Sequence, residues 1–277
     1  MRTADRLEET TALDTAVEPY RNLVQRLPAG RAKDFLHGVW LGHPLHPAVV
    51  QMAVGAYISA GVLDLMGGDE KAVRRLVGFG LLSSVPAAVT GAADWSDQHE
   101  QQQRVGIVHA AANSAAAVMY LASLAARSRR RARAFRFAGL MTASLSSALG
   151  GHMSFRQAAG ANHAEAVPHL VEPGWHRLAA LDDLPVGTPI RRMLGEVPVV
   201  VVRQDGVVRA LADQCSHLAG PLSGGEVDGG AITCPWHGST FRLSDGGVVC
   251  GPATAPQPAF ETQVRDGDVY VCLPGTG

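Results

Sequence analysis

The feature that most constrains this chain is a set of four windows without Asp, Glu, Lys or Arg. They comprise residues 47–63, 76–93, 105–126 and 137–155 and hold 17, 18, 22 and 19 residues. A helix of about 17–25 apolar residues spans a bilayer. Four such windows, joined by short charged loops, therefore predict a bundle of membrane-spanning helices. Their many Ala, Gly and Ser residues suit close helix packing in lipid. A buried core of a soluble protein is the alternative.

The sequence changes character after Phe155. Residues 156–169 are small and polar and contain Pro168, which is typical of a linker. From Leu170 onward, short apolar runs alternate with the pairs Asp205-Gly206, Asp245-Gly246 and Asp266-Gly267, which indicate β-hairpins. The predicted fold class is α + β in separate domains. We expect an N-terminal tail (1–35), an all-α four-helix transmembrane bundle (36–156), a linker (157–169) and an all-β domain (170–277).

Two short clusters in the all-β domain carry residues that bind metals. Cys215 and His217 form C-x-H, and after sixteen intervening residues Cys234 and His237 form C-x-x-H. Two facing loops of this kind supply two thiolates and two imidazoles, which suits a 2Fe–2S cluster with Cys₂ on one iron and His₂ on the other. A tetrahedral zinc is the alternative, but zinc sites usually group their cysteines before their histidines.

This segment, from about residue 170 to 274, resembles a Rieske domain of the ferredoxin type. Cys215, His217, Cys234 and His237 fall on the ligand positions of that family, and 251–253 matches the loop that covers the cluster. The resemblance implies a 2Fe–2S cofactor. It also implies that the cysteines hold the buried iron and that the histidines hold the outer, reducible iron.

Departures from the high-potential members of the family favour a low reduction potential. Gly220 and Trp236 occupy the positions of the two cysteines that those members link by a disulfide. Ser239 is retained, but Phe241 replaces a tyrosine that donates a hydrogen bond to sulfur. Since hydrogen bonds to sulfur raise the potential, we expect a ferredoxin-like value. Cys250 and Cys272 are expected to be small buried residues, with a disulfide as the alternative.

The order of the spans brings several polar residues to one face of the bundle. These residues are His43, His46, Asp94, Trp95, His99, His109 and His152. His109 and His152 lie at matching depths, so we expect a b-type haem between them, with a quinone pocket or structural histidines as alternatives; His46 completes the tentative site. Gly42–Pro47 (GHPLHP) and Gly150-Gly151-His152 resemble an uncharacterised family of bacterial membrane proteins with four helices, which implies no function.

The distribution of basic residues predicts the orientation in the bacterial cell membrane. The loops on the opposite face contain Lys71, Arg74, Arg75 and six arginines between 127 and 136, whereas the near-face loop contains Arg104. Positive-inside reasoning makes the Rieske domain extracytoplasmic. No apolar export signal precedes the first span, and residues 128–131 (SRRR) resemble a weak internal twin-arginine signal.

We therefore expect a multi-pass membrane protein that transfers electrons through a 2Fe–2S cluster. Residues 238–277 leave no length for the catalytic domain of a Rieske oxygenase, so a redox component is expected rather than a complete enzyme. The expected partners are the lipid bilayer and an unidentified donor and acceptor, with a quinone as one candidate. The net charge of −1 gives no reason to expect nucleic acid. The alternatives are a carrier for a separate oxygenase and a non-catalytic redox sensor.

Overall fold

The computed structural model describes residues 2–274, which form two compact units. The helical unit comprises Met1–Pro28 and Pro44–Ala159. The β unit comprises Ala29–His43 and Gly160–Gly277. The β unit thus incorporates a segment that precedes the long helices in the chain.

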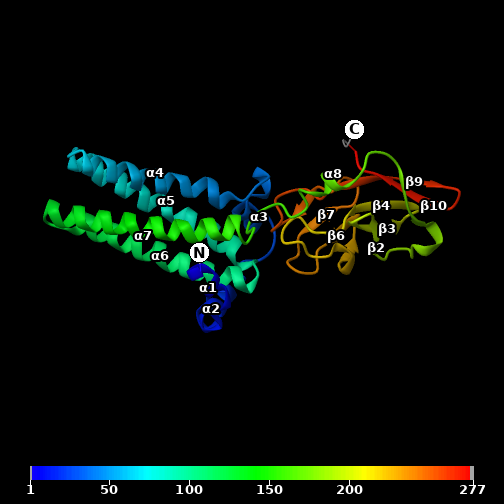
Figure 1. Ribbon diagram of the computed structural model, residues 1–277, viewed down its shortest axis with the longest axis horizontal. Coiled ribbons are helices and arrows are strands. Elements are labelled where there is room, and N and C mark those ends of the chain that lie inside the picture. The colour runs from blue at the N-terminus through cyan, green and yellow to red at the C-terminus, as the bar shows by residue number, and fades with distance from the viewer. Residues whose placement is uncertain (1, 275–277) are drawn as a thin grey trace. The chain divides into compact units, whose positions relative to one another are not determined.

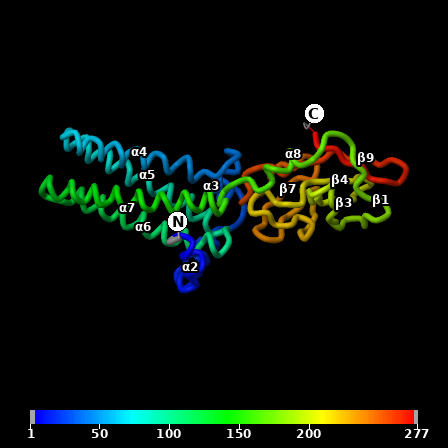
Figure 2. Tube along the Cα trace, in the orientation of Figure 1, coloured from blue at the N-terminus to red at the C-terminus, as the bar shows by residue number. Residues whose placement is uncertain are grey.

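Four long helices lie side by side in the helical unit (Figures 1 and 2). They are α4 (Leu45–Leu65), α5 (Glu70–Ser96), α6 (Glu100–Ala125) and α7 (Arg129–Phe155). The shorter elements of this unit are α1 (Arg2–Glu9), η1 (Thr11–Leu13) and α2 (Asp14–Val24). Helices α5 and α7 begin behind capping residues: Asp69 accepts a hydrogen bond from the amide of Ala72, and Ser128 accepts one from that of Arg131.

Among the described helices, α4, α5 and α6 are long and apolar enough to cross a membrane. Helix α7 matches them in length but falls below them in hydropathy, because arginines fill its first two turns and Gly and Ser are frequent beyond them. Large apolar side chains such as Leu82 and Leu145 point away from the protein and are 74% and 70% exposed. An outward apolar surface of this kind suits a lipid environment rather than water.

One end of the bundle contains a buried ion pair. Arg136 on α7 donates hydrogen bonds to both carboxylate oxygens of Asp64 on α4, at 2.5 and 2.8 Å. It also donates to Glu70 at the start of α5 at 2.8 Å. Because Asp64 and Arg136 are 1% and 2% exposed, each charge depends on the other for solvation.

The β unit contains two antiparallel sheets. The six-stranded sheet has the order β1-β10-β9-β4-β3-β2, and the four-stranded sheet has the order β5-β6-β7-β8. The strands are β1 (His176–Ala180), β2 (Ile190–Leu194), β3 (Val197–Gln204), β4 (Val207–Ala212), β5 (Glu226–Asp228), β6 (Ala231–Thr233), β7 (Thr240–Arg242), β8 (Val248–Cys250), β9 (Ala259–Arg265) and β10 (Asp268–Cys272). The helices of this unit are α3 (Arg31–His37), η2 (Val39–Leu41), α8 (Val167–Leu170), η3 (Leu181–Asp183) and η4 (Leu222–Gly224).

Two of the three Asp-Gly pairs form the expected tight turns, whereas Asp245-Gly246 lies in a longer connection between β7 and β8 in which only Gly246 has a positive φ. Asp205 and Gly206 have φ values of 54° and 76°, and Asp266 and Gly267 have values of 51° and 81°. These left-handed pairs connect β3 to β4 and β9 to β10 in tight hairpins.

Strand β3 divides the core of the β unit in two. Val199 and Val201 pack into one apolar cluster, and Val200 and Val202 pack into another that also contains Cys215 and Cys234. A continuous apolar run is required here because both faces of the strand are buried. The second cluster is the apolar floor of the candidate metal centre.

Candidate metal centre

Two loops of the β unit present the four expected ligands in the same backbone conformation. In the first loop, the amide of Cys215 donates to the carbonyl of Gly220, and Ala219 donates back to Cys215, both at 2.9 Å. In the second loop, Cys234 donates to Ser239 at 2.8 Å and Gly238 donates back at 3.1 Å. Ala219 and Gly238, each four residues after a cysteine, both have positive φ values. The two clusters therefore lie in matching turns, each closed by the same pair of backbone hydrogen bonds.

The two thiols meet in the apolar floor. Cys215 and Cys234 are 1% and 3% exposed. The Cys215 thiol donates a hydrogen bond to Cys234, which lowers the pKa of the Cys234 thiol to about 6. The same bond, together with burial, raises the pKa of the Cys215 thiol. A thiol with a lowered pKa readily becomes the thiolate that ligates metal.

The two imidazoles lie nearer the surface than the thiols. His217 and His237 are partly exposed, and their ring centroids lie 5.1 Å apart with an interplanar angle of 87°. Trp236, beside them, is half exposed. The donor set therefore has a buried sulfur side and a more accessible nitrogen side, which fits a cluster with Cys₂ on its inner iron and His₂ on its outer iron.

Gly220 leaves the space that such a group requires. A Cβ atom at this position would lie 2.9 Å from Sγ of Cys234 and 3.0 Å from the ring of Trp236. No side chain fits there without displacing a thiol or the indole. Gly220 thus lets the first ligand loop approach Cys234 and Trp236 closely.

The neighbours of the site agree with the expected low potential. Phe241 is fully buried in the cluster that contains both thiols and offers no hydroxyl. Ser239 is also fully buried, and its Oγ accepts a hydrogen bond from the amide of Ala253 at 3.0 Å. All four cysteines of the chain are free thiols, including Cys250 and Cys272.

Sequence reasoning missed Gln257, which joins the first ligand loop to the covering segment. Its side-chain amide donates to the carbonyls of Ala212 and Gln214 at 2.7 and 2.6 Å, and its Oε1 accepts from the amide of Ser216 at 3.0 Å. Gln257 is 2% exposed. Because it lies twenty residues after the last ligand, no local sequence signal marks it.

Sequence reasoning also missed Asp34 in helix α3. Its Oδ1 accepts a hydrogen bond from the amide of Gly251 at 2.9 Å and lies 3.6 Å from Sγ of Cys250. Burial raises the pKa of the Cys250 thiol. The covering loop of the metal centre is therefore attached to a segment from the other end of the sequence.

In the helical unit, His152 makes a different kind of contact from His46 and His109. Nδ1 of His46 lies 2.8 Å from the carbonyl of Ala87, and Nδ1 of His109 lies 2.8 Å from that of Ser146. Nε2 of His152 instead lies 2.7 Å from a carboxylate oxygen of Glu8. The expected haem between His109 and His152 therefore gains no support from these contacts, because His152 is engaged with helix α1.

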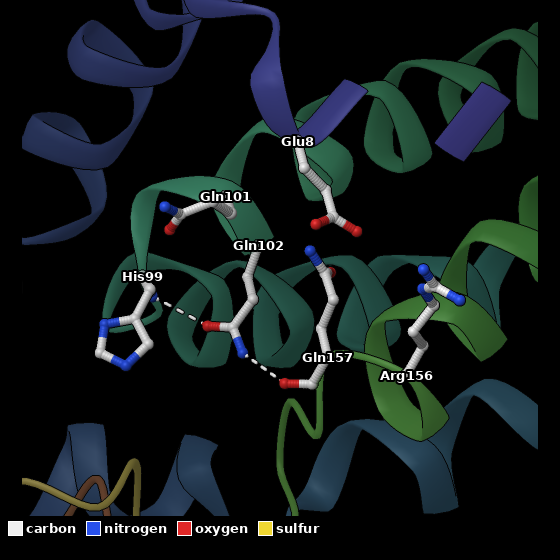
Figure 3. A pocket seen from close by; sticks show the side chains of 6 residues that line it. All are labelled: Glu8, His99, Gln101, Gln102, Arg156 and Gln157. Carbon is white, nitrogen blue, oxygen red and sulfur yellow. Dashed lines mark hydrogen bonds between the residues drawn. The ribbon is translucent and has the colours of Figure 1, made fainter. Parts of the chain in front are cut away.

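A pocket of about 270 Å³ lies in the helical unit beside Glu8, the partner of His152 (Figure 3). It is lined by Glu8, His99, Gln101, Gln102, Arg156 and Gln157. The side chain of Gln102 connects two segments that line this pocket. It accepts a hydrogen bond from the amide of His99 at 2.9 Å and donates one to the carbonyl of Gln157 at 2.8 Å. Asp5, Glu8 and His152 come together nearby, and Arg156 contacts Asp5 at 3.2 Å.

Two family models match the chain in separate segments. Residues 174–261 match the Rieske [2Fe-2S] domain, and residues 42–166 match the family described as predicted membrane protein (DUF2231).

Curated relatives match the same part of the chain as the first model. Ferredoxin CarAc of Metapseudomonas resinovorans is 38% identical over 99 residues, which is 35% of this chain and 92% of that protein. The anthranilate 1,2-dioxygenase ferredoxin subunit of Burkholderia cepacia is 34% identical, over 35% of this chain and 90% of that protein. Among solved structures, the ferredoxin of carbazole 1,9a-dioxygenase from Nocardioides aromaticivorans IC177 matches with 29% identity and a TM-score of 0.35. That match covers 36% of this chain and 97% of the ferredoxin.

The fold of the β unit and its Cys₂His₂ loops define an electron-transfer domain of the Rieske ferredoxin type. The chain belongs to the Rieske [2Fe-2S] family through this unit, and residues 42–166 before it match the predicted membrane protein family DUF2231.

Proposed function

We propose that this protein is a membrane-anchored, one-electron carrier in which Cys215, Cys234, His217 and His237 hold the 2Fe–2S cluster. The cluster supplies the one-electron chemistry when bound. The observation that carries this proposal is the pair of matching loops, which place two buried thiols beneath two partly exposed imidazoles. Electrons would enter and leave on the imidazole side, because the thiol side is covered by the apolar core.

The membrane anchor in this proposal consists of helices α4 to α7. Three of them qualify as spans by length and hydropathy. Helix α7 is included because it is as long as α5 and packs along α6 for much of its length. An even number of spans places the N-terminal segment 29–43 on the same side of the membrane as the Rieske domain. The proposal needs this arrangement, since that segment belongs to the β unit.

The acceptor that the relatives favour is an oxygenase. Two of them are named as ferredoxins or ferredoxin subunits, one explicitly of a dioxygenase. In this arrangement, a soluble reductase would reduce the cluster and the cluster would reduce a separate oxygenase. The low potential expected from Phe241 and from the missing cysteine pair agrees with that direction.

The basic residues of the loops favour a second arrangement, with an extracytoplasmic Rieske domain that is linked to the quinone pool. Lys71, Arg74 and Arg75 follow α4, and further arginines precede or begin α7. A concentration of Lys and Arg marks the cytoplasmic side. Two of these arginines pair with acidic side chains: Arg136 with Asp64 and Glu70, and Arg129 with Glu70 at 3.4 Å. Seven of the nine basic residues remain for this argument.

A haem between His109 and His152 is not part of the proposed function, because Nε2 of His152 lies 2.7 Å from a carboxylate oxygen of Glu8. A redox sensor without electron-transfer partners is distinguished by its phenotype. Loss of the cluster would then leave every respiratory and oxidative rate unchanged.

Iron analysis and EPR spectroscopy of the detergent-purified protein test the cluster assignment. We expect two irons per chain and a reducible 2Fe–2S signal in the wild type, and loss of both in Cys215→Ser and Cys234→Ser. Cys250→Ser and Cys272→Ser are the matched controls and should retain both. Zinc in place of iron, or an equal loss in the controls, would refute the assignment.

The side of the membrane decides between the two arrangements. A reporter that is active only in the cytoplasm, fused after the last residue, should be active if the protein serves a cytoplasmic oxygenase. A reporter that is active only outside should be active if the donor is the quinone pool. Oxidation of added quinol by the purified protein provides an independent check of the second arrangement.

A further inference from the structure

The helical unit is built from two similar hairpins, α4–α5 and α6–α7. The same 63 positions separate His46 from His109 and Tyr57 from Tyr120 in their first helices. The same 59 positions separate Gly80 from Gly139 and Gly91 from Gly150 in their second helices. The two tyrosine rings stack at 3.8 Å with an interplanar angle of 5°. Equivalent residues therefore meet at the centre of the unit, as they do around a two-fold axis.

His46 and His109 have equivalent surroundings in the two hairpins. The ring of His46 lies against Gly91, where a Cβ atom would come within 2.8 Å of Nδ1. The ring of His109 lies against Gly150, where a Cβ atom would come within 3.2 Å of Cε1. The Nδ1 atoms lie 2.8 Å from the carbonyls of Ala87 and Ser146, which are themselves equivalent positions. The glycines and the carbonyls fix both rings.

These contacts determine which ring nitrogen carries the hydrogen. A carbonyl oxygen only accepts, so Nδ1 of each histidine must donate, and Nε2 of each neutral ring keeps its lone pair. Asn113 agrees with this assignment, since its Nδ2 lies 3.0 Å from Nε2 of His109 as a donor. Histidines that bind metals typically donate their other ring N–H to a carbonyl or carboxylate in this way.

The side chain next to that lone pair, Asn113, is an exposed residue one turn further along α6. Asn113, Ala116 and Tyr120 follow His109 on the same helix face at intervals of three or four residues. Ala116 and Tyr120 are buried, but Asn113 is exposed. The helices pack closely within each hairpin and more loosely between the hairpins. The present partner of Nε2 of His109 is therefore an exposed side chain that a ligand can reach and displace.

We propose that His46 and His109 form a second redox or metal site, in which their Nε2 atoms bind one transition-metal centre between the two hairpins. Two fixed, neutral imidazoles suit a divalent metal ion and equally suit the iron of a haem. When the metal binds, Nε2 of His109 gives up its hydrogen bond from Asn113 and bonds to the metal instead. This site goes beyond the proposed Rieske function and involves none of its ligands.

The test uses full-length, cluster-loaded protein in detergent, so that the Rieske ligands are occupied. Haemin is added in one arm and followed by its Soret band, and Co²⁺ is added in the other and followed by its visible bands. We expect one equivalent of one probe to bind to the wild type, and the arm that responds identifies a haem or a free ion. His46→Ala and His109→Ala should weaken binding at least tenfold, whereas His152→Ala, the control at the same end of the unit, should bind as the wild type does.

Two further variants separate ligation from folding. His46→Gln keeps a side-chain donor for the carbonyl of Ala87 but is a poor ligand, so it should lose binding while the protein still elutes as a single species. Gly91→Ala keeps the imidazole but displaces its ring and should weaken binding by about 10- to 100-fold, as changes around metal ligands do. The proposal is overturned if neither probe binds stoichiometrically, or if the doubly substituted protein, His46→Ala with His109→Ala, binds as the wild type does.

Discussion

Replacing Gln257 with alanine should loosen the metal centre without removing a ligand. The change deletes three buried hydrogen bonds, two donated to Ala212 and Gln214 and one accepted from Ser216. At about 1 kcal/mol net for each bond, the free energy that holds the covering segment against the first ligand loop falls by about 3 kcal/mol. Since 1.4 kcal/mol corresponds to a factor of ten, the open form becomes about 100-fold more populated.

Chelator-driven loss of the cluster measures that population. If the segment opens and closes faster than the chelator removes iron, the rate of bleaching follows the equilibrium of opening. We expect Gln257→Ala to bleach about 100-fold faster than the wild type at equal chelator concentration. Gln257→Glu keeps the acceptor but loses both amide donors, so it should also bleach faster. A change of less than threefold in Gln257→Ala would show that these bonds do not hold the segment closed.

Three further outcomes follow from the structure. The wild-type midpoint potential, measured by EPR-monitored redox titration, should lie below about +200 mV within the Rieske range. Phe241→Tyr should raise that potential by supplying a hydrogen-bond donor near sulfur. An unchanged or lower potential in the variant would contradict a role for the missing hydroxyl. Asp34→Ala should speed cluster loss about tenfold because the amide of Gly251 loses a carboxylate acceptor, whereas Asp34→Asn should remain near the wild type. Arg136→Met should destabilise the helical unit by about 3–5 kcal/mol in thermal unfolding, because it leaves Asp64 charged and buried. Adding Asp64→Asn should restore most of the lost stability. Equal stability of the single and double variants would count against a buried charge.

The two turns that carry the predicted ligands could be placed from the sequence because each Cys/His pair is local. A cysteine and a histidine two or three residues apart can occupy one turn, and the structure forms the two turns with the same hydrogen bonds. The Asp-Gly pairs at 205–206 and 266–267 were equally readable, because the left-handed conformation of a tight hairpin selects those residues. Both the Rieske family and the division into a helical and a β region are confirmed.

The membrane histidines show where this reasoning stops. Depth along a helix can be counted from the sequence, and it pairs His109 with His152. Rotation about the helix axis and packing against neighbouring helices cannot be counted in the same way. In the structure, Glu8 from helix α1 contacts His152, whereas His46 occupies the position equivalent to that of His109.

The sequence by itself determined that this protein has apolar helices and a Rieske domain with two Cys/His loops, because charge-free windows and Cys/His spacings are properties of short, continuous segments. Only the tertiary structure decided which distant residues support those features. Gln257 and Asp34 hold the covering loop, and Arg136 neutralises Asp64, through contacts between residues far apart in the chain. The physical reason is that such contacts depend on how packed elements are oriented in space, which no local pattern encodes.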